Sequence, residues 1–173
     1  MFYISLLLVI LIVYCTVVLF SLGSLAASIK GSPYVPTPQN RVREMLSMAN
    51  LRKKDTLFDL GSGDGRILIA AAKKGVRAHG WEINPILFIL SRIYAYRSGV
   101  SKFVHVHPVN YRRAPLSDAT VITIYGLPYL VNDIGDKVIV ACRKGTRIVS
   151  YRFPISSLPL TVQSKNKIYL YTV

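Results

Sequence analysis

The sequence predicts an α/β fold with a mostly parallel sheet, preceded by one apolar helix and closed by a C-terminal antiparallel hairpin. Three observations lead to this prediction. Residues 1–29 contain no charged side chain. From residue 51 onwards, short apolar runs alternate with helical patterns, as in chains that build parallel sheets. Two short runs at 160–163 and 168–173 then end the chain as a hairpin.

The first element is predicted to be a transmembrane helix. Residues 1–29 are dominated by Leu, Ile, Val and Phe, and about 20 such residues suffice to cross a bilayer. A cleaved signal peptide needs a basic stretch before its apolar core, but the first basic residue is Lys30; Leu25-Ala26-Ala27 keeps cleavage open as the alternative. Lys30, Arg41 and Arg43 follow the helix. The positive-inside tendency therefore predicts a single-pass membrane protein with its C-terminal part in the cytoplasm.

Residues 30–50 are expected to connect this helix to the folded domain. Three prolines within 32–39 favour an extended linker, and a short helix is expected at about 41–49. The domain is predicted to span residues 51–173. This length supports one hydrophobic core.

The domain begins with the most informative run of the chain, LFDLGSGDGR at 57–66. Its apolar start predicts a buried strand, its glycines predict a sharp turn, and a helix is expected at 67–74. A second strand at 77–81 ends in Glu82, about 20 residues after the turn. Such a turn lets the backbone approach a ligand, and a carboxylate at that distance can accept hydrogen bonds from both ribose hydroxyls. The pattern indicates a nucleotide or nucleoside site.

The identity of that nucleotide depends on a few positions. A dinucleotide fingerprint has its third glycine where this chain has Arg66, and no phosphate-binding loop ending in Gly-Lys-Ser/Thr occurs. Asp59 and Asp64 would repel a pyrophosphate, whereas they suit a cation. S-adenosylmethionine carries both an ammonium and a sulfonium. The residues therefore favour this cofactor, with the two aspartates holding its amino acid part.

The glycine run and the sequence WEINP at 81–85 resemble the class I S-adenosylmethionine-dependent methyltransferases. Together with PYVPTP at 33–38 and VSYRFP at 149–154, they are similar to the small membrane-anchored protein-lysine methyltransferases. That family includes the enzymes for the ATP synthase c-subunit and the adenine nucleotide translocase, and prokaryotic relatives. The resemblance covers nearly the whole chain. It implies a Rossmann-like class I methyltransferase fold, an S-adenosyl-L-methionine cofactor and lysine N-methylation.

The resemblance also implies roles for individual residues. The glycine motif surrounds the methionine part of the cofactor, Glu82 binds the ribose, and Asn110, after a third strand at 103–107, stands near the adenine amine where Asp is commoner. A fourth strand at 119–125 leads to Gly126-Leu127-Pro128, where the family positions the acceptor. The expected cofactor-binding residues are Asp59, Gly61, Ser62, Gly63, Asp64, Gly65, Glu82 and Asn110.

Two tyrosines are candidates for contact with the incoming amine, Tyr34 and Tyr125, through hydroxyl or ring. We take Tyr125 as the catalytic candidate, with simple packing as its alternative. No Asn-Pro-Pro-Tyr/Phe run follows the fourth strand, which disfavours methylation of a nucleobase amine.

The charge balance bears on the partners. The chain has 22 Lys and Arg against eight Asp and Glu, and three of these acids belong to the predicted site. A basic surface suits anionic lipid, so we expect the membrane bilayer and a membrane-associated protein substrate as partners. RNA is the less favoured partner, because phosphate contacts also use Lys and Arg. The alternatives are thus an RNA methyltransferase and a noncatalytic membrane protein that binds the cofactor.

The histidine and cysteine pattern does not predict a metal site. His105 and His107 share one strand face but lack a third predicted ligand. Cys15 lies in the apolar helix and Cys142 far from it in a predicted helix, which indicates reduced thiols and no disulfide framework.

Overall fold

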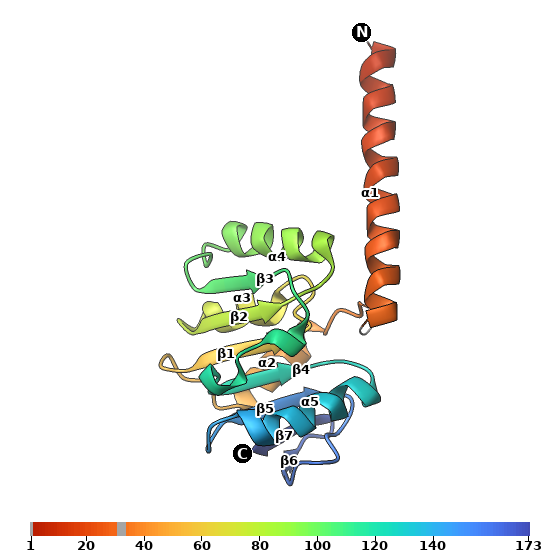
Figure 1. The fold of residues 1–173 in the computed structure, drawn as a ribbon. Coiled ribbons are helices and arrows are strands. Elements are labelled where there is room, and N and C mark those ends of the chain that lie inside the picture. The colour runs from red at the N-terminus through yellow and green to blue at the C-terminus, as the bar shows by residue number, and fades with distance from the viewer. Residues whose placement is uncertain (1, 31–33) are drawn as a thin grey trace.

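The computed structural model describes residues 2–30 and 34–173. Figure 1 shows a sheet-containing domain with one long helix, α1 (Phe2–Lys30), standing beside it. The sheet has seven strands in the order β3-β2-β1-β4-β5-β7-β6. Their bounds are β1 Thr56–Leu60, β2 Arg77–Trp81, β3 Val104–His107, β4 Val121–Ile124, β5 Arg147–Tyr151, β6 Leu160–Gln163 and β7 Ile168–Thr172.

Strands β1 to β5 run parallel, and β7 runs antiparallel to both β5 and β6. The predicted Rossmann-like class, with its antiparallel end, is therefore confirmed. The helices that follow α1 are α2 (Gln39–Met48), α3 (Arg66–Ala72), α4 (Pro85–Arg97) and α5 (Pro128–Ala141); two 3-10 turns, η1 (Tyr111–Arg113) and η2 (Leu116–Asp118), precede β4.

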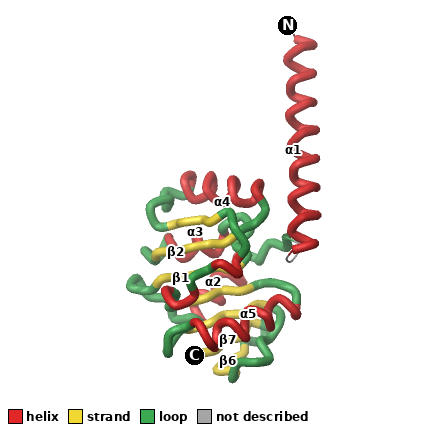
Figure 2. The backbone as a smooth tube through the Cα atoms, viewed as in Figure 1, coloured by secondary structure: helices red, strands yellow, loops and turns green. Residues whose placement is uncertain are grey.

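Two hydrophobic clusters, one on each face of the sheet, form the core. Figure 2 shows helices on both faces of the sheet. Alternation along β1 sends Leu57 into one cluster with residues of α2, α3 and α4, and Phe58 into the other with residues of α5. Because β1 and β4 are covered on both faces, they are buried and mostly apolar, whereas β2 also carries the exposed Arg77 and the half-buried His79. The polar side chains of the site are the exceptions at their carboxyl ends.

Helix and strand ends differ from the predictions by a few residues. The helix expected at 67–74 begins at Arg66 and ends at Ala72, and the strands expected at 103–107 and 119–125 are shorter at their ends. Cys142 caps α5 instead of lying inside a helix. The cap of α4 is well defined, because Asn84 Oδ1 accepts hydrogen bonds from the N–H groups of Ile86 and Leu87.

The apolar N-terminal helix is present, and its 20-residue stretch Tyr3–Leu22 has a mean hydropathy of 2.8 with no residue buried in the protein. It is long and apolar enough to cross a membrane, a property that signal sequences share. Met1 and residues 31–33 lie outside the described residues. Residues 34–38 contain no helix, as expected, and α2 then packs with α3 and β5 into the core.

Candidate active site

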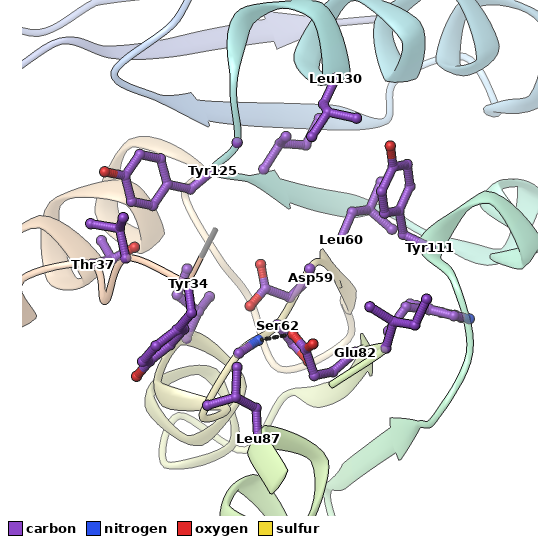
Figure 3. A pocket seen from close by; sticks show the side chains of 18 of the residues that line it. Tyr34, Thr37, Asp59, Leu60, Ser62, Glu82, Leu87, Tyr111, Tyr125 and Leu130 are labelled. Carbon is purple, nitrogen blue, oxygen red and sulfur yellow. Dashed lines mark hydrogen bonds between the residues drawn. The ribbon is translucent and has the colours of Figure 1, made fainter. Parts of the chain in front are cut away.

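The carboxyl ends of β1, β2 and β4 surround a cavity of about 240 Å³ (Figure 3). In parallel sheets, ligands bind at such ends, where the strand order reverses, here between β1 and β4. The structure brings together nearly all of the predicted site residues around this cavity: Asp59, Gly61, Ser62, Gly63, Asp64, Glu82, Asn110 and Tyr125. Gly65 is the one that does not line it.

Gly63 and Gly65 both have positive φ angles, +56° and +78°, but they meet different neighbours. A Cβ atom on Gly63 would lie 2.9 Å from the ring of Tyr34. A Cβ atom on Gly65 would lie 2.9 Å from Cβ of Ser91 on α4. Gly65 therefore allows α3 and α4 to pack closely, and its predicted role in cofactor binding stays a prediction.

Glu82 holds the glycine loop in place. Its carboxylate accepts hydrogen bonds from the N–H of Gly63 (2.8 Å) and the N–H of Asn84 (2.7 Å), and its residue is 7% exposed (Figure 3). Burial raises the pKa of Glu82, while the two N–H donors act against that rise. The carboxylate thus joins the loop after β1 to the start of α4, at the end of β2.

Asp59 is more deeply buried than Glu82, and its carboxylate accepts fewer hydrogen bonds. Its residue is 3% exposed, and the hydrogen bond that its carboxylate accepts comes from Oγ1 of Thr123 on β4, at 2.7 Å. Burial raises the pKa of Asp59 to about 7; the Thr123 hydroxyl opposes the rise, and the charges of Glu82 and Asp64 add to it. A cation bound beside Asp59 would restore its charged form.

The hydroxyl of Ser62 is a second buried polar group with few hydrogen bonds. Its Oγ atom is buried and has no hydrogen-bond partner within the described residues. Buried hydroxyls are normally paired, so a ligand that donates to or accepts from this oxygen would satisfy it. Ser62 lines the cavity, and its Oγ atom lies close to Gly80 on β2.

Asp64 is engaged differently from Asp59, because Arg66 binds both of its oxygens. Nε of Arg66 lies 2.9 Å from Oδ1, and Nη2 lies 2.7 Å from Oδ2. Burial alone would raise the pKa of Asp64, but the hydrogen bonds and charge of Arg66 outweigh it and lower that pKa. Nη1 of Arg66 also donates to the backbone carbonyl of Thr37 at 2.8 Å. The ion pair therefore ties the linker to the glycine loop.

The linker itself forms one wall of the cavity, through Tyr34, Val35, Pro36 and Thr37. Figure 3 shows Tyr34 and Thr37 on the same side of the cavity as Tyr125, with Tyr111 across from them. Sequence reasoning named Tyr34 as an amine contact but missed Thr37 and Arg66 as structural parts of the site. In the sequence, the ion pair was indicated by an acid and a base two residues apart, Asp64 and Arg66.

Two other predicted residues lie at the rim. Asn110 Oδ1 accepts a hydrogen bond from the N–H of Arg112 and so caps η1. Tyr125 follows β4, half-buried, with its ring centroid 4.8 Å from that of Tyr151. Packing therefore accounts for at least part of the conformation of Tyr125.

His105 and His107 share a strand face as predicted, and His79 on β2 joins them. Burial, followed by the two neighbouring histidines, lowers the pKa of His79 to about 4, so the cluster packs with a neutral ring at its centre. Within residues 2–30 and 34–173, no group of three His, Cys, Asp or Glu side chains is arranged to hold a metal ion.

The model of the ANTKMT methyltransferase domain matches residues 59–161, from Asp59 to the closing hairpin. The chain belongs to this family. The match confirms the predicted methyltransferase family and explains why the glycine loop, Glu82 and the β4 end occur together in a single short domain.

Several curated relatives match the chain. A protein-lysine N-methyltransferase of Saccharolobus islandicus (strain REY15A) is 37% identical over 71% of this chain and 78% of its own length. The ATP synthase c-subunit lysine N-methyltransferase of Xenopus laevis is 35% identical over 70% and 54%, and the adenine nucleotide translocase lysine N-methyltransferase of Mus musculus is 34% identical over 82% and 63%. The chain spans about half the length of the Xenopus laevis relative.

Solved structures agree on the fold. The crystal structure of an RNA methyltransferase from Salinibacter ruber, in complex with S-adenosyl-L-homocysteine, superposes with a TM-score of 0.75. It is 34% identical and covers 80% of this chain and 94% of that one. A geranyl diphosphate methyltransferase with bound S-adenosylmethionine, 18% identical with a TM-score of 0.58 over 65% and 48%, shows the shared fold alone.

Proposed function

We propose that this protein is an S-adenosylmethionine-dependent protein-lysine N-methyltransferase that acts on a membrane or membrane-associated protein. The observation that carries the cofactor is the pair of buried carboxylates at adjacent strand ends, Asp59 with a single hydroxyl donor and Glu82 with two backbone donors. The acceptor follows from the relatives named as lysine methyltransferases at 34–37% identity.

Each of the site residues contacts a different part of the cofactor. Asp59 binds the ammonium end with its buried carboxylate, and Ser62, which also lines the cavity, contributes to cofactor binding. Glu82 accepts from the ribose hydroxyls with oxygen lone pairs that the two N–H groups leave free. Gly61 and Gly63 let the backbone approach the methionine part, and Asn110 stands at the adenine end. Asp64 contributes through Arg66, by keeping the loop closed against the linker.

When bound, S-adenosylmethionine supplies a methyl group on a sulfonium. A neutral lysine amine would accept that methyl group, with S-adenosylhomocysteine as the leaving group and one proton released to water. The protein orients the two groups in line, which supplies much of the rate gain. Apolar walls such as Leu130 and the ring of Tyr125 lower the pKa of the amine by disfavouring its charged form. No obligatory general base is therefore assigned, and Tyr125 borders the acceptor.

The membrane assignment rests on α1 and on charge. Helix α1 spans the bilayer, and the domain stays on the cytoplasmic side because Lys30, Arg41 and Arg43 follow the apolar segment. The net charge of +14 favours anionic lipid. A substrate held in or near the same membrane then meets the site without diffusion from the bulk.

The test is label transfer by the full-length protein in detergent. The protein is incubated with methyl-tritiated S-adenosylmethionine and separate membrane, soluble and RNA fractions of its host, with the Glu82→Ala variant as the matched control. Label at lysine in a membrane polypeptide, absent with the variant, is the expected result. Label only in soluble polypeptides would overturn the membrane substrate.

RNA methylation is the second candidate, because the neighbour from Salinibacter ruber is named an RNA methyltransferase and the chain is strongly basic. It predicts nuclease-sensitive label and steeply salt-dependent RNA binding. Cofactor binding without label in any fraction would instead indicate a noncatalytic protein.

A further inference from the structure

Helix α4 carries an apolar stripe on the side that faces away from the core. Leu87, Ser91 and Ala95 are buried against the domain. On the opposite side, Ile89 and Ile93 are 53% and 45% exposed. Tyr96 continues the stripe at 77% exposed, with Ile86 and Leu90 half-buried beside it. A surface helix normally turns polar residues outward, so this stripe needs a partner.

The position of α4 suggests that partner. Helices α1 and α4 contact each other. Figure 1 shows α1 upright and α4 running crosswise beside its lower part, as the outermost helix of the domain on the side toward which α1 rises. A helix that lies crosswise to a membrane-spanning neighbour has the orientation of an interfacial helix. Its apolar stripe then continues the apolar surface of α1.

The charges beside the stripe favour lipid over a second copy of the chain. Residues 85–97 contain Arg92 and Arg97 and no acid, and the exposed Lys102 follows in the next turn. Arg92 lies over the ring of Phe88, 5.6 Å from its centroid. Two copies meeting on this face would bring like charges together, whereas Arg and Tyr beside an apolar stripe suit the headgroups of an anionic bilayer.

We propose that α4 is an interfacial membrane-binding helix that lays the catalytic domain on the bilayer, with Ile89, Ile93 and Tyr96 inserted below the headgroups. This contact of α4 with the membrane goes beyond the proposed methyl transfer. It requires only that α1 lies in a bilayer. It sets the orientation of the domain, with β3 nearest the membrane and β6 farthest from it. The cavity, at the ends of β2, β1 and β4, then lies inward from that edge of the sheet, and the linker that follows α1 forms one of its walls.

The test places a nitroxide spin label at single cysteines of the full-length protein in phosphatidylcholine–phosphatidylglycerol vesicles. Cys15 and Cys142 are first replaced by Ala, and retained binding of S-adenosylhomocysteine shows that each variant is folded. Ile93→Cys reports on α4. Val162→Cys on β6 is the matched control, because Val162 is 48% exposed on the opposite edge of the sheet.

Lipid insertion predicts that a water-soluble nickel reagent reaches the Ile93→Cys label at least about threefold less than the control label, while oxygen reaches it more. Equal access at both sites overturns the proposal. Loss of access to both reagents at Ile93→Cys also overturns it, because that result indicates a protein partner. Ile89→Cys repeats the measurement if Ile93→Cys fails to fold. A label at native Cys15 shows separately whether α1 lies in lipid, and no arm depends on methyl transfer.

Discussion

The two sides of the cavity are built on different principles. The side formed by β1 and β2 holds buried carboxylates, positive-φ glycines and short hydrogen bonds to backbone N–H groups. The side that follows β4 has no acid within residues 121–130, and its half-buried Tyr125 contacts another aromatic ring. The first side can recognise a ligand through hydrogen bonds and charge. The second side presents an apolar surface that can recognise a ligand only by its shape.

This difference teaches where the protein controls its chemistry. In the proposed function the cofactor binds to the polar groups of the β1 and β2 side, so substitutions there should alter cofactor affinity strongly. An acceptor carried by a partner is met by a surface that excludes water, so changes there should alter rate modestly. The following predictions test that division, from the largest expected effect to the smallest.

Glu82→Ala should give the largest loss, about 100-fold or more in cofactor affinity, because it removes the proposed ribose acceptor and leaves the N–H groups of Gly63 and Asn84 without their partner. Calorimetric titration with S-adenosylhomocysteine measures this. Glu82→Gln is the control, since its single carbonyl oxygen retains part of the acceptor capacity and should lose less. Wild-type affinity in Glu82→Ala would remove Glu82 from the site.

Asp59→Asn should lower cofactor affinity about tenfold or more, and yet stabilise the ligand-free protein at pH 8. The folded pKa of about 7 lies above the ordinary 3.8, so the folded state binds more protons between these values. The stability that protonated Asp59 contributes is present at low pH and is lost as pH rises through about 7.

Thermal melts of both proteins without ligand from pH 5 to 8 check this sign. The wild type should lose stability relative to Asp59→Asn as pH rises, while its affinity for the cofactor ammonium rises. If the thermal stability of both proteins changed with pH in the same way, the raised pKa would not belong to Asp59.

Gly63→Ala should weaken binding by an intermediate amount, about tenfold, because a Cβ at φ +56° costs about 1–2 kcal/mol and also meets Tyr34. Tyr34→Ala in the same chain removes the steric part only. The double variant should therefore recover part of the loss, measured by the same titration, and no recovery would show that Tyr34 does not press on the loop.

Tyr125→Phe should have the smallest effect, within about threefold of the wild-type methylation rate, because in the proposed function the ring and not the hydroxyl borders the acceptor, and Phe keeps the ring contact with Tyr151. Tyr125→Ala should lower the rate further at unchanged cofactor affinity. A loss above 100-fold in Tyr125→Phe would make the hydroxyl essential and would break the contrast between the two sides.

Much of the side formed by β1 and β2 could be predicted, because the sequence patterns that indicate it are local. The glycine turn, the strand before it and Glu82 all fall within residues 57–82, and the periodicity of each segment shows directly in the sequence. The exact role of Asp64 was less accessible. Its charge suggested a bound cation, whereas the structure pairs it with Arg66, two residues away, and extends that pair to Thr37.

The sequence alone determined the fold class, the apolar helix, the glycine loop and the positions of the two carboxylates, because each depends on neighbouring residues and simple periods. Tertiary structure decided the rest: Thr123 donates to Asp59, 64 residues away, Tyr34 packs on Gly63, and Ile89 and Ile93 face outward from α4 beside α1. Such contacts join segments that are distant in the chain, so the local pattern of residues does not show them; the parallel pairing of β1 with β4 brings Thr123 to Asp59.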